Sequence, residues 1–128
     1  MLIRMLICLS MLLSACVKSN EIFILISVTE LQDSAKVVND IVAKHGLIEL
    51  GRITSGPIDD YLFESEKISR FRVSYMPNQI AFDSTASEYS AALLNEICAQ
   101  LTNFNAVVDK IEGDLSERDV SKCVKLKR

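Results

Sequence analysis

Beyond the first twenty residues, apolar and polar positions fall into short blocks that predict strands. Residues 22–28 are nearly all apolar and rich in β-branched side chains, which is typical of a strand buried on both faces. Residues 47–54 predict a second strand, and residues 71–75 alternate as a half-buried strand does. The turn at 76–79 predicts a hairpin in which 80–83 pairs back on 71–75.

Apolar residues at helical spacing predict two long helices. The first begins at a capping box of Thr29 and Gln32 and ends at Gly46, which suits a left-handed helix cap. The second begins at a capping box of Thr85 and Glu88. Its apolar stripe consists of Tyr89, Leu93, Ile97, Leu101 and Phe104.

Three further segments are less strongly patterned. Acids in the first turn of residues 59–67 suit the helix dipole and predict a short helix there. Residues 106–111 fit either an extension of the second helix or a last edge strand, and residues 116–120 predict one helical turn. Gly51 is a candidate bulge within the strand at 47–54.

This order of elements predicts an α+β fold. We expect a small antiparallel sheet with two main helices packed on one side, and a ferredoxin-like arrangement is the nearest common architecture. The domain would span residues 21–128. A chain of 128 residues is long enough for one compact core and too short for two.

The start of the chain has the layout of an export signal. Arg4 supplies a basic start, residues 5–13 are apolar, and small residues precede Cys16. The apolar run is shorter than the roughly 20 residues of a spanning helix. A secreted or single-pass protein, or a cytosolic protein with this run as a core element, is an alternative.

The tetrapeptide Leu13-Ser14-Ala15-Cys16 resembles the lipobox of bacterial lipoproteins. In that class the cysteine sulfur receives a diacylglycerol, and a peptidase cuts the chain just before it. The resemblance covers only this processing segment and says nothing of the rest of the chain.

The resemblance implies a signal peptide over residues 1–15, lipid attachment at Cys16 with palmitate-type acyl chains, and a lipidated tether over residues 16–20. Val17 stands where the sorting rule of Gram-negative lipoproteins would place Asp for inner-membrane retention. The resemblance therefore favours the outer membrane, facing the periplasm, if the source is Gram-negative. The membrane would be a partner through this anchor.

Charge and composition argue against nucleic-acid binding. The chain has 14 basic and 17 acidic residues, a net charge of −3, no Trp and few other aromatics. A nucleic-acid binder needs a basic stripe, which this sequence lacks.

Two cysteines remain after Cys8 and Cys16 are assigned to the signal and the anchor. An even pair in an exported chain predicts a disulfide between Cys98 and Cys123. The alternative is that Cys98 is a small apolar helix residue and Cys123 a free thiol.

The sequence contains no recognisable catalytic or metal-binding constellation. His45, the only histidine, falls in the last turn of the first predicted helix, where a cation is favoured on structural grounds alone. A catalytic base would need a nucleophile and an orienting acid, and a metal site would need further ligands. We therefore expect no cofactor, no metal and no enzymatic activity.

One acidic and aromatic cluster stands out as a candidate partner-binding site. Its members are Asp59, Asp60, Tyr61, Phe63 and Glu64. Aromatic rings anchor many protein interfaces, and acids steer a basic partner. A solvated acidic helix with its apolar face turned inward is the alternative, and paired carboxylates of an active site are another.

Taken with the predicted anchor, this cluster favours a lipid-anchored cell-envelope protein. It would act as a small protein-binding module of an accessory, inhibitor or immunity type, with an envelope protein as its partner. The alternative is a small envelope enzyme or ligand-binding protein that uses carboxylates.

Overall fold

The computed structural model describes residues 21–113 and 119–127. The predicted signal segment, Cys16 and the tether lie outside the described residues, as does most of the helical turn predicted at 116–120. Those predictions therefore stay predictions.

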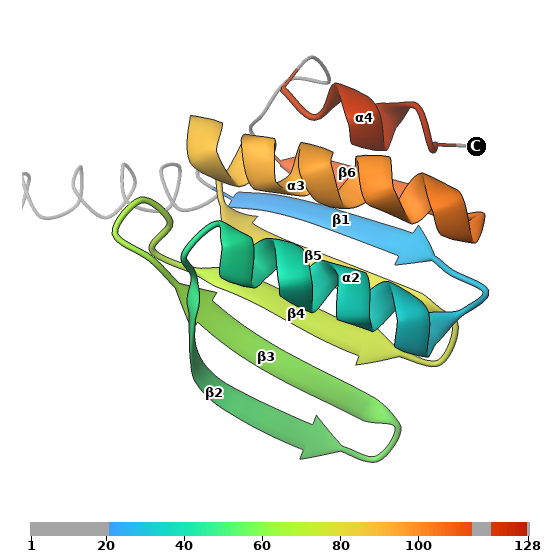
Figure 1. Cartoon of the computed structure of the whole chain (residues 1–128), viewed down its shortest axis with the longest axis horizontal. Coiled ribbons are helices and arrows are strands. Elements are labelled where there is room, and N and C mark those ends of the chain that lie inside the picture. Colours follow the sequence, from blue (N-terminus) through green and yellow to red (C-terminus); the bar gives the residue numbers. More distant parts are fainter. Residues whose placement is uncertain (1–20, 114–118, 128) are drawn as a thin grey trace, which may run out of the picture.

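One antiparallel sheet forms the framework of the described chain (Figure 1). It has six strands in the order β2-β3-β4-β5-β1-β6. The strands are β1 (Glu21–Ser27), β2 (Ile48–Ser55), β3 (Ile58–Glu64), β4 (Phe71–Met76), β5 (Gln79–Thr85) and β6 (Val107–Gly113). Strands β2 to β5 follow one another as a meander, and β1 lies between β5 and β6.

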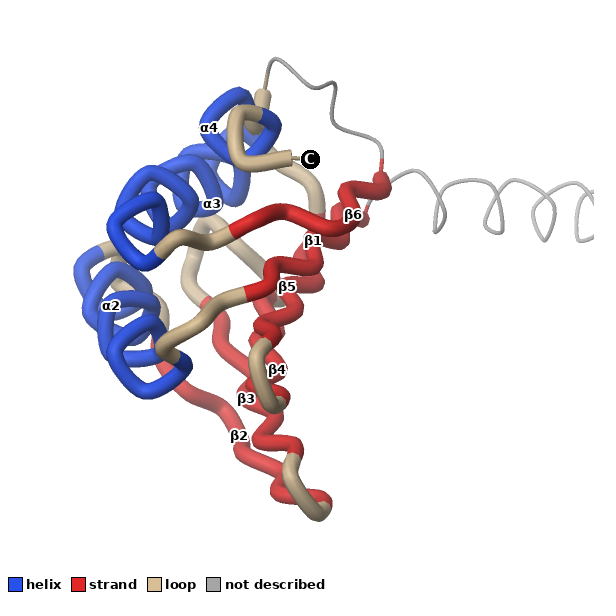
Figure 2. The backbone as a smooth tube through the Cα atoms, turned by 90° about the vertical axis from the view of Figure 1, so that its right-hand side faces the viewer, coloured by secondary structure: helices blue, strands red, loops and turns tan. Residues whose placement is uncertain are grey.

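The helices cover one face of this sheet and leave the other face open (Figure 2). The helical elements are α2 (Leu31–Lys44), α3 (Glu88–Leu101), η1 (Thr102–Phe104) and α4 (Ser121–Val124). The core lies between this helix layer and the sheet, where every second residue of β1, β4 and β5 is buried. We call the uncovered side the open face.

The predicted α+β class, with two main helices on one side of a small antiparallel sheet, is confirmed. The ferredoxin-like arrangement is not confirmed. That motif has two strands between its helices, whereas β2, β3, β4 and β5 all lie between α2 and α3.

The predicted helix at 59–67 is wrong, because residues 59–64 belong to β3 and residues 65–67 form no helix. Strand β3 pairs with β2 on one side and β4 on the other. Tyr61 and Phe63 are good strand formers that turn inward, whereas Asp60 and Glu64 turn outward. Pairing on both sides outweighs the weak helix preference of an acidic first turn.

Both helices begin differently from the prediction. Thr29 does not cap α2; its hydroxyl donates to the carbonyl of Phe104 at 3.3 Å, and the N-cap residue is Glu30. Helix α3 has its capping box two residues later than predicted, between Ser87 and Ser90. Thr85 is not free to cap a helix because it is the last residue of β5.

Several local predictions are confirmed. Gly46 has a φ of +78°, and the N–H of Leu47 donates to Val42 at 3.2 Å. The pairing of β2 with β3 shifts register between Glu49 and Gly51, as expected of a bulge. Of the two alternatives for residues 106–111, the edge strand is the one found, since residues 107–111 belong to β6 and not to a longer α3.

Candidate protein-binding surface

Strand β3 divides the predicted acidic and aromatic cluster between two faces. Tyr61 and Phe63 lie opposite Val73 and Phe71 of β4, which belong to the core. Asp59 shares their side of the strand, whereas Asp60, Leu62 and Glu64 alternate onto the open face. The cluster is therefore not a single surface.

The ring of Phe63 is part of the core rather than an interface anchor. Phe63 is 7% exposed, and Tyr61 is half-buried against the same core. The two rings stack with centroids 6.2 Å apart, and Tyr61 meets the edge of Tyr75 at 5.6 Å. Burial raises the pKa of Tyr75, whose hydroxyl donates to Asn39 at 3.2 Å. These contacts reassign Phe63 to packing.

Asp60 is held by neighbours on the open face. The guanidinium of Arg72 donates to both carboxylate oxygens of Asp60, with an Nε–Oδ1 distance of 3.0 Å. The hydroxyl of Ser74 adds a bond of 2.6 Å. These hydrogen bonds, chiefly those from Arg72, hold the pKa of Asp60 below its usual value. Asp60 is thus a structural partner of Arg72.

Asp59 is also engaged within the hairpin. It accepts a hydrogen bond of 2.8 Å from the hydroxyl of Thr54 and lies 3.8 Å from the guanidinium of Arg52. That guanidinium is 5.1 Å from the centroid of Tyr61. The guanidinium groups of Arg52 and Arg72 offset the negative charges of Asp59 and Asp60. These two acids therefore attract a basic partner only weakly.

The sequence analysis missed the apolar side chains that the structure exposes on the β2–β3 hairpin. Four of the five large apolar side chains exposed in the described chain lie there. They are Ile48, Leu50, Ile53 and Ile58. Ile48 is 61% exposed and Ile53 68%. The alternation of residues 47–54 identifies the strand but does not reveal that it lies at the edge.

The open face continues from Ile53 into a shallow hollow beside β4. The hollow has a volume of about 460 Å³, and its walls include Ile53, Leu62, Arg70 and Arg72. Arg70 is fixed by ion pairs with Glu21 at 2.7 Å and with an Asp of β5 at 3.2 Å. Protein interfaces have apolar cores and are enriched in Arg.

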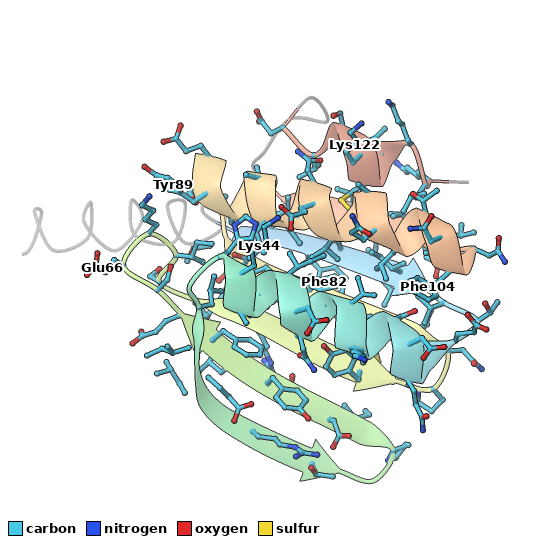
Figure 3. The ribbon with its side chains drawn as sticks, in the orientation of Figure 1. Lys44, Glu66, Phe82, Tyr89, Phe104 and Lys122 are labelled. Atoms are coloured by element: carbon cyan, nitrogen blue, oxygen red, sulfur yellow. A yellow bond between two sulfur atoms is a disulfide. The ribbon has the colours of Figure 1, made fainter. Side chains whose placement is uncertain are left out.

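The opposite edge of the sheet is partly covered by the C-terminal residues, which contact the start of β6. The sulfur atoms of Cys98 and Cys123 are 2.14 Å apart, so the predicted disulfide is present and ties α4 to α3 (Figure 3). The N–H of Val108 in β6 then donates to the carbonyl of Leu126 at 2.9 Å. Val108 also forms a parallel bridge with Lys127.

His45 has a structural role between the two long helices. Its Nε2 atom lies 3.3 Å from a carboxylate oxygen of Glu96, which also pairs with Lys44 at 3.2 Å. Although burial opposes it, hydrogen bonds from Lys44 and His45 hold the pKa of Glu96 below its usual value. This cluster links the end of α2 to α3.

Within residues 21–113 and 119–127, no three His, Cys, Asp or Glu side chains are placed so that they would hold a metal ion. None of the helices in those ranges is long and apolar enough to cross a membrane. Comparison with models of known protein families gave no match, and comparison with curated proteins gave none either.

Proposed function

We propose that this chain is a lipid-anchored protein of the bacterial cell envelope that binds another protein through the open face of its sheet. The observation that carries the binding proposal is the concentration of exposed apolar side chains on one hairpin, beside a hollow lined by Arg70 and Arg72. Exposed apolar surface of this kind, rimmed by polar residues, marks interaction sites.

The anchor rests on the tetrapeptide that ends at Cys16. Two or more acyl chains hold a protein stably at a bilayer, whereas one does so only marginally. In a bacterial host, we expect mass spectrometry to find the chain 16–128 with acyl groups on Cys16.

The Cys16→Ser variant should lose the acyl mass and leave the membrane fraction. Cys8→Ser is the matched control, since Cys8 lies inside the predicted signal segment, and it should be processed normally. A Cys16→Ser protein that stays membrane-bound with residues 1–15 attached would contradict the anchor.

The partner we propose is an envelope protein with an apolar surface, bound for an accessory, inhibitory or immunity purpose. Residues that are exposed and contribute little to folding, such as Ile53, are the contacts most available to it. Carboxylate chemistry is less well supported, because Asp59 and Asp60 are engaged by Thr54 and Arg72.

Capture from crosslinked envelopes tests the binding proposal. The full-length protein should recover one stoichiometric partner, and Ile53→Lys should reduce that recovery at least tenfold. Ala92→Lys places the same charge at an exposed position of α3 and should leave recovery unchanged. Equal recovery with both variants, or no partner at all, would contradict binding through the open face.

A further inference from the structure

Among the described residues, nothing pairs with the outer edge of β2. In residues 21–113 and 119–127, the sole pairing partner of β2 is β3, and all eight residues of β2 are exposed. Among the described residues, no other strand lies beyond it. A row of unpaired N–H and C=O groups is a template for another strand.

The bulge in β2 decides which side chains share a face. Glu49 and Arg52 are three residues apart, so a regular strand would place them on opposite faces. The register shift between Glu49 and Gly51 supplies one extra residue. As a result both side chains lie on the helix side, opposite Phe63 and Tyr61 respectively.

The same shift places two isoleucines together on the open face. Ile48 lies opposite Glu64 and Ile53 lies opposite Asp60, and both of these acidic residues point to the open face. Strand β2 therefore presents an acid and a base on one side and two apolar residues on the other.

The outer edge of β2 is complementary to the same edge of a second copy of this chain. Two β2 strands can pair antiparallel about a two-fold axis. In the register that places Ile48 opposite Ile53 of the second copy, Glu49 lies opposite Arg52 of the second copy. Each pair then occurs twice, as an isologous interface requires. Leu50 meets Gly51 of the second copy, and nothing lies within 4 Å of the position that a Cβ of Gly51 would occupy.

The side chains of Glu49 and Arg52 are both placed so that they could form this contact. Glu49 has no hydrogen bond or ion pair to any described residue. The guanidinium of Arg52 is held on the helix side by Tyr61 and Asp59. Opposite charges directly across a strand pair stabilise it, and like charges destabilise it.

We infer that β2 pairs with β2 of a second copy of this chain in the register Ile48 to Ile53, so that two sheets join edge to edge. A two-fold axis normal to the sheet keeps the helices of both copies on one face and brings the two open faces side by side. A single strand pair is at the small end of protein interfaces. We therefore expect an equilibrium between monomer and dimer. This inference goes beyond the proposed function and does not depend on its partner.

Cysteine crosslinking in the full-length protein tests the register. Under mild oxidation, Ile48→Cys/Ile53→Cys should form a covalent dimer on non-reducing gels, and a mixture of the two single variants should form one as well. Each single variant alone should not, because equivalent positions lie about 16 Å apart along the strands, beyond the roughly 7 Å that a disulfide spans.

A charge exchange tests the ion pairs without cysteine chemistry. Glu49→Arg should raise the dimer dissociation constant at least tenfold, since it creates two like-charge contacts. The double variant Glu49→Arg/Arg52→Glu should restore dissociation to within about threefold of the original, because it rebuilds both pairs in reverse. The melting temperature of each variant at monomer concentration shows whether folding is intact.

A protein that stays monomeric at every concentration, or a double exchange no tighter than Glu49→Arg alone, overturns the inference. Crosslinking in the single Ile48→Cys variant overturns the register. If the purified protein dimerises but captures no envelope partner, only the proposed function is contradicted. Partner capture that persists without any dimer removes only the inference.

Discussion

The two edges of the sheet, β6 and β2, differ in whether other described residues contact them. At β6, the C-terminal residues lie alongside the strand, hydrogen-bond it at Val108 and are fixed to α3 by the disulfide. At β2, no described residue covers the edge, and apolar side chains are exposed along it. Proteins usually block strand edges to prevent pairing with other chains. This difference supports the proposal that the β2 edge pairs with another strand.

The two edges also differ in what they contribute to folding. Val108, Val120 and Cys123 are buried where the C-terminal segment covers the start of β6, and they belong to the core. Strand β2 has no buried residue, so its side chains add little to stability. Changes near β6 or on the inner face of β3 should therefore act on folding, and changes on β2 should act on association.

The largest expected effect is a difference in stability between a variant on the inner face of β3 and a variant on β2. Phe63→Ala should lower the free energy of unfolding by about 3–5 kcal/mol, because it empties part of the core. Ile53→Ala, the control on β2, should change it by less than about 0.5 kcal/mol. Urea unfolding of both variants provides the measurement, and similar losses at the two positions would contradict the division.

The second largest loss of stability is expected when the disulfide is removed. Replacing Cys98 and Cys123 together by Ala should lower the free energy of unfolding by about 3–4 kcal/mol in the chain-entropy model. It should also loosen the C-terminal segment and speed amide exchange at Val108, whose N–H is bonded to that segment. Unfolding by urea and amide exchange measure the two effects.

Thiol labelling provides the control for the disulfide. In the unfolded but unreduced mature protein, Cys98 and Cys123 should scarcely react. Quantitative labelling at both positions would show that the bond is absent and that the β6 edge is held by other contacts.

A smaller effect is expected at the ion pair on the open face. Asp60→Asn should cost about 1.5–3 kcal/mol at neutral pH, because Arg72 would lose a charged hydrogen-bond partner. Asp59→Asn is the more exposed control and should cost less than about 1 kcal/mol.

The cost of Asp60→Asn should depend on pH. The folded protein holds the pKa of Asp60 below its unfolded value, so this carboxylate stabilises the fold fully above roughly pH 4. That contribution is lost as the pH falls through the lower, folded pKa. The stability difference from the original protein should therefore shrink under acid conditions. A difference that grows with acidity would contradict the role of the ion pair.

Much of the fold can be predicted from the sequence because its signals are local. The apolar run of β1, the left-handed Gly46 and the bulge at Gly51 each depend on a few neighbouring residues. The capping residues were harder to predict, since Thr29 and Thr85 have the right chemistry for a cap. Each is engaged in another contact that only the folded chain reveals.

The candidate surface could be predicted only in part, because it depends on strand order. The acids of residues 59–67 favour a helix start, whereas the strand found there depends on pairing with β2 and β4. Nothing local in residues 48–55 shows that this strand is the outermost one. Exposure of Ile48 and Ile53 follows from that position rather than from their own preference for burial.

Amide hydrogen exchange on the two edge strands, measured from dilute to concentrated protein, tests the central claim most directly. The outward amides of β2 should exchange quickly at low concentration and become protected as the concentration rises, while the amide of Val108 in β6 stays protected throughout. Protection of β2 that never changes with concentration, or fast exchange at Val108 in the intact disulfide form, would contradict the assignment of β2 as the open, pairing edge.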